Sequence, residues 1–459
     1  MTSPGHLVPP PARSRAEPFG KFPFAFGKRF FLALAMGLVW TAPAWWDARY
    51  LWGMLLWDVA ILAAWAWDLR RLPDPAAIEV ARIWNQPVTL AAESSLSLEL
   101  RHSAGFPLLV TLRDDVPASL RAESPTLEIS VPPGGVARAA YSIRPRARGD
   151  ARLGDTFLRY RSFLQLAERW AAAPLPQTVR VYPNLEEAKR NTLYLIRARQ
   201  GVMERRVRHL RGRGREFESL REYRQGDESR DICWTATARR GKPITKLFQV
   251  ERSQTVWLVL DAGRLLRARS DGLAKLDYAT AAALALAQVA IYSGDSVGLL
   301  AYGRKLQQRV APGRGSRHMR VLLDALAQVR AEAVEANHRQ AAEAILTLQK
   351  RRSLVVWLSD LAETATTPEV VESAARMSRR HLVLLAVIAQ PEMRQRLAQE
   401  PENAREMYRY AAAQEIVQRR DLLLGELRRQ GALAMEIEPS RLSTNLVGQY
   451  LEAKDRSLI

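Results

Sequence analysis

The sequence has few of the residues that build disulfides, metal clusters or catalytic triads. Cys233 is its one cysteine, which excludes an internal disulfide and a cysteine-based zinc cluster. The six histidines, at positions 6, 102, 209, 318, 338 and 381, show neither metal-ligand nor triad spacing. We therefore expect no resident cofactor, and nothing in the cysteine content favours an oxidising compartment.

The composition is that of an ordinary globular protein with a basic excess. Hydrophobic residues make up 47% and charged residues 25% of the 459, which excludes a mostly disordered or collagen-like chain. That length predicts about three domains. The 68 Lys and Arg against 48 Asp and Glu give a formal charge of +20, which attracts nucleic acid or anionic lipid.

Two apolar runs near the N-terminus, Phe30–Trp46 and Leu51–Trp67, predict a transmembrane helical hairpin over residues 28–72. Each run has 17 residues, and together they hold all seven tryptophans found between positions 40 and 67. A helix of about 20 residues crosses the hydrocarbon core, and tryptophan favours its borders. Two other interpretations stay open: a buried hairpin of a soluble domain, and a signal peptide cleaved after Ala42-Pro43-Ala44.

Basic residues predict the orientation of this hairpin. Lys and Arg precede the first run and follow the second, whereas the loop between them holds one Asp and one Arg. By the positive-inside rule both termini and all soluble domains are expected in the cytoplasm of a bacterial inner membrane protein. Asp58 lies within the second run. It is expected to be protonated, paired or turned toward the first helix.

Short alternating runs indicate a small β-sandwich over residues 73–185, preceded by a disordered cytosolic tail over 1–27. His102 is expected at the surface or in a turn of this domain. The predicted strands are separated by Gly and Pro and cover residues 95–100, 108–112, 126–131, 136–143 and 178–182.

The most basic stretch follows, within a segment that we place at residues 186–253. Residues 189–246 hold 17 Lys and Arg against 7 Asp and Glu, half of the whole excess. A solvated helix over 186–211 is the plainest interpretation. Contact with anionic inner-leaflet lipid and with a protein partner stay open. Nucleic acid is not expected, because the aromatics that stack on bases are few.

A long ordered motif occupies the end of this segment. It begins with Gly214-Arg215-Glu216-Phe217 and continues through Leu220-Arg221-Glu222-Tyr223, Gly226-Asp227, Arg230-Asp231-Ile232-Cys233-Trp234 and Ala238-Arg239-Arg240. This motif resembles the signature of the DUF58 family of bacterial proteins. Two upstream landmarks, Arg148-Gly149-Asp150 and Val181-Tyr182-Pro183, extend the resemblance to about residues 28–450.

The resemblance implies a von Willebrand factor A-like C-terminal half and partnership with an AAA+ ATPase of the MoxR type. Read from the residues alone, the motif indicates an ion-pair network in which Trp234 is a core anchor. We expect the motif and one loop face of the next domain to bind a partner. The candidate residues are Arg221, Tyr223, Gly226, Asp227, Arg230, Trp234, Arg239, Arg240, Arg264 and Ser316.

From residue 254 to 459, alternating strands and helices predict an α/β domain with a doubly wound, von Willebrand A-like sheet. The predicted helices cover 276–292, 319–331, 339–350, 368–378 and a long stretch over 391–430. The strands, at 255–260, 296–301, 353–358, 382–388 and 432–437, are apolar and β-branched, as in a buried parallel sheet.

Asp261 and Asp360 follow two of these strands, where the resemblance implies a metal-ion-dependent adhesion site. That site needs hydroxyls at two positions that hold Gly263 and Leu265 here, and Arg264 adds a cation. Ser316 is a candidate for the missing hydroxyl. We therefore favour carboxylates satisfied by backbone amides or by Arg264 over a degenerate site for a divalent metal such as Mg²⁺.

These features predict a non-enzymatic, membrane-anchored adaptor or binding protein. Gly294-Asp295-Ser296-Val297-Gly298 matches the nucleophile-elbow pattern, but Ser296 is expected to open a strand, and an elbow serine follows one. The alternatives are a hydrolase-like enzyme that uses the 214–240 motif and a basic nucleic-acid-binding protein, whose affinity would fall steeply with salt.

Overall fold

The computed structural model describes residues 7–184, 216–224, 229–249, 254–361 and 367–456. The chain divides into two compact units, Met1–Tyr182 and Pro183–Ile459, which are taken separately below. The predicted basic helix over 186–211 lies outside the described residues, so it stays a prediction.

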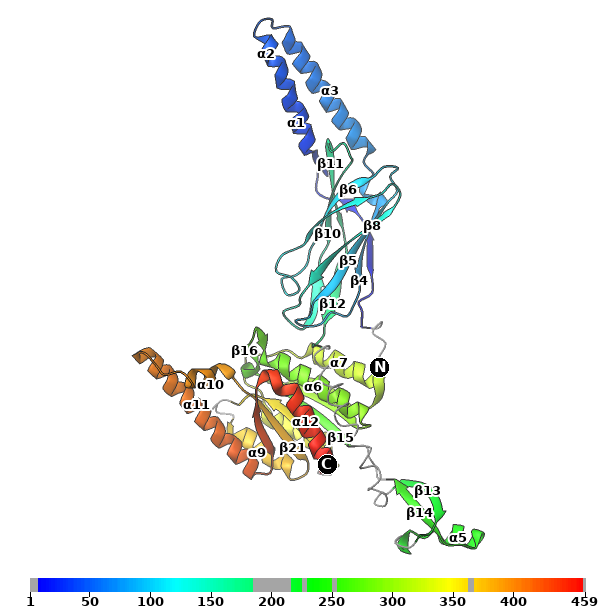
Figure 1. Cartoon of the computed structure of the whole chain (residues 1–459), viewed down its shortest axis with the longest axis vertical. Helices are drawn as coiled ribbons and strands as arrows, with labels where there is room; N and C mark the ends of the chain where they lie inside the picture. Colours follow the sequence, from blue (N-terminus) through cyan, green and yellow to red (C-terminus); the bar gives the residue numbers. More distant parts are fainter. Residues whose placement is uncertain (1–6, 185–215, 225–228, 250–253, 362–366, 457–459) are drawn as a thin grey trace. The chain divides into compact units, whose positions relative to one another are not determined.

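The two N-terminal apolar runs are helical and pack side by side (Figure 1). Trp57 Nε1 donates to the Ala33 carbonyl at 2.8 Å. The second run is one helix, α3 (Tyr50–Arg71). The first is interrupted, and consists of α1 (Lys28–Met36), the 3-10 turn η2 (Gly37–Trp40) and the short α2 (Thr41–Ala44).

This interruption leaves the prediction of two spans unconfirmed. Among the described residues, α3 alone is long and apolar enough to cross a membrane. The break falls at Gly37, a poor helix former, where a Cβ would lie 2.8 Å from Trp57. The same hypothetical Cβ would lie 3.1 Å from Asp58 Oδ1, so this carboxylate faces the first run.

The rest of the first unit is two antiparallel sheets and a separate strand pair, which confirm the five predicted strands and add seven. One sheet has the order β1-β4-β5-β8, and the other β2-β11-β10-β6-β7. Their main strands are β4 (Ile78–Trp84), β5 (Ser94–His102), β6 (Leu108–Asp114), β7 (Thr126–Val131), β8 (Val136–Ile143), β10 (Thr156–Arg161) and β11 (Ala167–Ala173), with β9 (Gly149–Leu153) and β12 (Gln177–Val181) as a separate pair.

The prediction of a disordered tail over residues 1–27 is wrong for its described part. Strand β1 (Ala12–Arg15) pairs with β4. Strands β2 (Glu17–Pro18) and β3 (Phe24–Phe26) both pair with β11. The Pro- and Arg-rich composition indicated disorder, but the open edges of the two sheets give this segment backbone partners that its own sequence does not reveal.

A buried ion pair joins the two sheets of the first unit. Arg82 and Asp114 are both fully buried, and Arg82 Nη2 lies 2.5 Å from Asp114 Oδ1. The same carboxylate accepts hydrogen bonds from the hydroxyls of Tyr141 (2.5 Å) and Thr156 (2.7 Å). Burial, with Asp114 beside it, raises the pKa of Tyr141 far above its ordinary value. His102, predicted at the surface or in a turn, is buried at the end of β5 and contacts the Val131 carbonyl.

The described part of the signature folds as a hairpin with a helix. Strand β13 (Glu216–Glu222) pairs antiparallel with β14 (Ile244–Gln249). Between them lie the 3-10 turn η4 (Ser229–Asp231) and α5 (Trp234–Arg240), which ends at Gly241 with a φ of 66°. Only glycine adopts that backbone conformation at no steric cost.

The C-terminal α/β domain contains the predicted sheet, in the order β19-β18-β15-β20-β21-β22. The strands are β15 (Thr255–Asp261), β18 (Ser296–Tyr302), β19 (Leu306–Gly313), β20 (Leu354–Ser359), β21 (Leu382–Ile388) and β22 (Leu433–Ile437). All neighbours are parallel except β19, which runs antiparallel to β18. Strand β19 was missed because it is polar and half exposed.

Helices form two groups that cover this sheet (Figure 1). One group is α6 (Lys275–Tyr292), α7 (Gly315–Gln328) and α12 (Leu442–Asp455), in which α6 contacts both other helices. The other, α8 (His338–Leu348), α9 (Thr367–Ser378) and α11 (Ala404–Arg429), shares a hydrophobic core with Trp257 and Trp357. The long helical stretch predicted over 391–430 is two helices, α10 (Pro391–Leu397) and α11.

Candidate functional site

Asp261 and Asp360 lie where the sequence predicts them, at the carboxyl ends of the neighbouring strands β15 and β20. Asp261 is 3% exposed. Its Oδ1 accepts from the Gly263 amide at 2.7 Å and its Oδ2 from the Ser359 hydroxyl at 2.6 Å. Burial raises the pKa of Asp261 against the effect of these hydrogen bonds. The backbone amide thus serves this carboxylate as expected.

Two cations of the chain itself surround Asp360. Its Oδ2 lies 2.6 Å from the Lys275 ammonium, and its Oδ1 lies 3.0 Å from Arg420 Nη2. Arg420 also bonds Glu436, at 2.8 Å. Although burial opposes it, the bonds and charges of Arg420 and Arg394 lower the pKa of Glu436. Lys275, Asp360, Arg420 and Glu436 therefore form a network of alternating charges at this edge of the sheet.

This arrangement does not fit a divalent cation. Both Asp360 oxygens already accept from buried cations, and both Asp261 oxygens accept from neutral donors. The chain supplies Gly263 and Leu265 where a hard cation needs hydroxyl ligands. Within the described ranges, no three His, Cys, Asp or Glu side chains gather as a metal site would require. Arg264 takes no part here, because it pairs with Glu335 at 2.9 Å.

A recess of about 650 Å³ opens beside Asp360. The turn η5 (Arg264–Arg267), which follows β15, supplies two arginines to its wall. The start of α10 and the middle of α11 supply most of the remaining lining. The lining residues are Arg264, Leu265, Arg267, Ala268, Asp360, Gln390, Met393, Glu415, Ile416, Arg419 and Arg420.

Ser316 is not part of this edge, so its predicted role as a hydroxyl ligand is wrong. Strand β19 runs antiparallel to β18, and Val297, near the start of β18, lies opposite Gly313 at the end of β19. Ser316 follows in the first turn of α7, at the amino edge of the sheet. Ser296 opens β18 at that same edge, which confirms that it is not a nucleophile elbow.

The signature residues that the structure describes lie on the hairpin. Arg221 and Tyr223 come from β13 and its end, and the Tyr223 amide donates to the Pro243 carbonyl at 2.9 Å. Arg239 and Arg240 occupy the exposed last turn of α5. Of the remaining predicted residues, Gly226, Asp227 and the side chain of Arg230 lie outside the described residues.

Trp234 is 70% exposed, so the prediction that it anchors a core is wrong. It begins α5, a helix of seven residues with no buried side chain. The same helix carries Arg239 and Arg240, both exposed, in its last turn. The signature therefore presents an aromatic and two arginines to solvent.

Three residues of this network, Lys275, Arg420 and Glu436, were not among the predicted site residues. Lys275 is fully buried at the first position of α6, and Arg420 is 7% exposed in the middle of α11. Their partner Asp360 is 85 and 60 residues away along the chain. One local signal was present: Glu436 interrupts the short strand β22, where a charged residue needs a partner.

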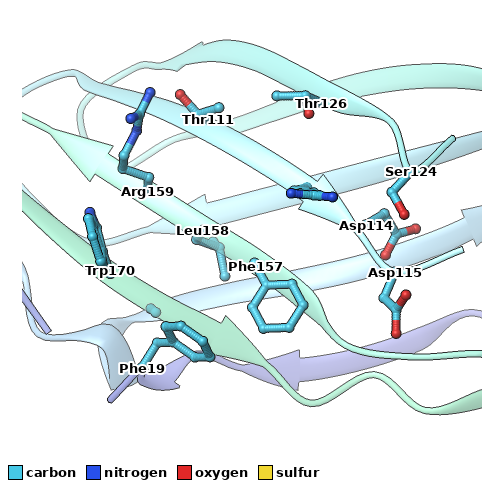
Figure 2. Close-up of a pocket in the computed structure, with 12 residues that line it drawn as sticks. Phe19, Thr111, Asp114, Asp115, Ser124, Thr126, Phe157, Leu158, Arg159 and Trp170 are labelled. Carbon is cyan, nitrogen blue, oxygen red and sulfur yellow. The ribbon is translucent and has the colours of Figure 1, made fainter. Parts of the chain in front are cut away.

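A second recess, of about 560 Å³, lies on the sheet of β6, β10 and β11 in the first unit. Figure 2 shows Phe19, Phe157 and Trp170 along one side of it and Asp114 and Asp115 at one end. The rings of Phe19 and Phe157 meet edge to face at 5.3 Å. Phe19 follows β2, so the N-terminal segment that was predicted to be disordered shapes this recess.

Part of the chain is similar to a family model. Residues 219–400 match the family model "Protein of unknown function DUF58", a shorter stretch than the 28–450 predicted. No curated protein matches the chain. The conserved hypothetical protein BatB from Bacteroides thetaiotaomicron is similar at 12% identity and a TM-score of 0.31, over 44% of this chain and 100% of that one.

Two further solved structures are similar. The SpRpn10 VWA domain is 14% identical, with a TM-score of 0.27, and the match covers 43% of this chain and 95% of that domain. Proximal thread matrix protein 1 from the mussel byssus is 10% identical, with a TM-score of 0.28, over 43% and 46% of the two chains.

Proposed function

We propose, from the match of residues 219–400 to the DUF58 family model, that the chain is a non-enzymatic, membrane-anchored adaptor that binds other proteins. In this proposal the α/β domain is von Willebrand A-like. Its observed order of five parallel strands with one antiparallel edge strand supports that assignment. The coarse role, protein interaction, is what the family and the α/β fold favour together.

The exposure of Trp234 carries the proposal. Trp234 is 70% exposed at the start of α5, and Arg239 and Arg240 are exposed at the end of the same helix. Tryptophan and arginine are the residues most enriched among those that dominate protein-binding energy. Their place inside the family signature supports a docking role for the hairpin.

The partner that we propose is a MoxR-type AAA+ ATPase, as the family resemblance implies. Co-expression of the full chain with such an ATPase should give co-purification from detergent-solubilised membranes. Trp234→Ala should weaken this association by about tenfold, as expected for a central aromatic contact. The measurement is the apparent Kd by biolayer interferometry.

Tyr292→Ala is the matched control. Tyr292 is 68% exposed at the end of α6, so this variant also removes an exposed aromatic ring, but outside the signature. It should bind the ATPase as the wild type does. Equal Kd values for the wild type and Trp234→Ala would remove the support for docking through α5.

We propose that the two packed N-terminal runs together anchor the chain, with both ends cytoplasmic. The side chains of α3 that point outward are apolar, including Leu55 (53% exposed), Leu56 (69%) and Leu62 (47%). Arg70 and Arg71 end this helix, which supports the cytoplasmic orientation. The basic 189–246 stretch supports additional contact with anionic inner-leaflet lipid.

The double variant Leu55→Arg/Leu62→Arg should lose most of its stable insertion. Each arginine near the centre of a span costs about 2.5–3.5 kcal/mol on insertion scales. The measurement is the fraction of chain that stays in the membrane pellet after an alkaline carbonate wash. Ala48→Arg, in the loop between the runs, is the control and should pellet as the wild type does. Retention of the double variant in the pellet would contradict the anchor.

A further inference from the structure

We propose that the recess beside Asp360 binds an acidic side chain of a partner protein through Arg264 and Arg267, without a divalent cation. The inference rests on the proposed adaptor function and names the chemistry of one docking site. It starts from the disagreement between the residues at this edge and the metal site that the resemblance implies.

The positive charge that a metal would supply comes from the chain. Lys275 is fully buried and its ammonium contacts Asp360 Oδ2 at 2.6 Å and the Ile388 carbonyl at 3.2 Å. Arg420 covers the other oxygen of Asp360. Because Lys275 and Arg420 neutralise the charge of Asp360, this carboxylate does not offset the positive charge of Arg264 and Arg267 in the recess.

Arg264 and Arg267 point to the same side of η5. In a 3-10 turn, side chains three residues apart are eclipsed, so the first and fourth residues of Arg264–Arg267 form a pair. Arg264 pairs with Glu335 at the surface, where its side chain is 48% exposed. Such a surface ion pair contributes little to stability, so Arg264 can exchange Glu335 for the carboxylate of a partner protein. Arg267 is exposed and has no ion pair with any residue that the structure describes.

The rest of the lining favours a peptide over a bare anion. Four apolar side chains, those of Leu265, Ala268, Met393 and Ile416, line the recess together with the arginines. Methionine adapts its shape to the side chain that it meets. An acidic residue with an apolar neighbour on the partner would therefore place its carboxylate between two guanidinium groups and its apolar neighbour against Met393. Arginine holds a carboxylate through two parallel hydrogen bonds.

The test uses the full chain in nonionic detergent and a fluorescein-labelled peptide of alternating glutamate and leucine. Fluorescence anisotropy should give a Kd about tenfold or more weaker for Arg264→Ala/Arg267→Ala than for the wild type. Arg317→Ala, which removes an exposed arginine at the amino edge, should shift the Kd by less than about twofold. The same peptide with glutamine in place of glutamate should bind the wild type and both variants with similar Kd values. Chelation with EDTA or addition of Mg²⁺ should leave the wild-type Kd unchanged.

Three results would overturn the inference. The first is equal binding of the glutamate peptide by the wild type and the double variant, with both proteins folded by circular dichroism. The second is binding that EDTA abolishes and Mg²⁺ restores. The third is displacement of the peptide by phosphatidylglycerol vesicles that themselves require both arginines, which would make the recess a lipid site. If any of these occurs while ATPase capture still depends on Trp234, the adaptor function stands and this inference alone fails.

Discussion

Replacing Arg82 with methionine is expected to lower the free energy of unfolding of the first unit by about 3–5 kcal/mol. The substitution leaves the Asp114 carboxylate buried without its cation, although the Tyr141 and Thr156 hydroxyls remain in place. Removing one partner of a buried pair has a cost of this size, because a lone charge in the interior is poorly solvated. Arg82 also donates to the Leu175 carbonyl at 2.7 Å, a bond that the variant loses.

Hydrogen exchange of the β5 and β6 peptides, followed by mass spectrometry, reads the stability of this unit within the full chain. Arg138→Met is the control, because Arg138 pairs with Glu99 at the surface, where such pairs contribute about 0–1 kcal/mol. The double variant Arg82→Met/Asp114→Leu should recover most of the loss, since it removes both charges. A loss below about 1 kcal/mol for Arg82→Met would show that the pair is not a central element of this unit.

Replacing Asp360 with asparagine is expected to destabilise the α/β domain by a similar amount, about 3–5 kcal/mol. It leaves the fully buried Lys275 ammonium without an anion. Lys275→Met should cost less, about 2–3 kcal/mol, because Arg420 still compensates Asp360. The informative result is which variant loses more stability. Asp360→Asn leaves Lys275 with no oppositely charged partner, whereas Lys275→Met leaves Asp360 with Arg420.

Hydrogen exchange of the β15, β20 and β21 peptides measures the stability of both variants. The double variant should lose less stability than the sum of the two single losses. In the wild type, Mg²⁺ should not change the result. A metal bound at this edge would add about 2.7 kcal/mol at a concentration 100 times its Kd. A stability gain of that size on adding Mg²⁺, or a larger loss for Lys275→Met than for Asp360→Asn, would contradict a network closed by the chain's own cations.

The parts of the fold that were predicted are those whose signal is local. The strand 382–388 was predicted to the residue, because all of its positions except the first are buried between two parallel neighbours and its sequence is a continuous apolar run. Strand β19 has the sequence LQQRVAPG and lies at the sheet edge, where one face meets water and the pattern weakens. The N-terminal strands were missed for a related reason, because their partners β4 and β11 lie far along the chain.

In the candidate site, too, the residues with a local sequence signal were predicted and those that depend on distant contacts were not. Asp261 and Asp360 were placed at the carboxyl edge because an acid directly after a buried strand is visible in the sequence. Ser316 was misplaced because the direction of β19, which carries it to the opposite edge, is a property of strand pairing. The cations Lys275 and Arg420 could not be assigned to Asp360, since contacts across 85 and 60 residues leave no mark in composition or spacing.

The most direct test of docking at the carboxyl edge is photo-cross-linking from within the recess in native membranes. A benzophenone amino acid replaces Met393 in the full chain, and the same amino acid replaces Ser316, at the amino edge, as the control. We predict that position 393 cross-links an acidic segment of a partner protein, that the glutamate–leucine peptide competes with it, and that position 316 gives no such product. Cross-links of equal yield from both positions, or from position 393 to lipid alone, would contradict the account.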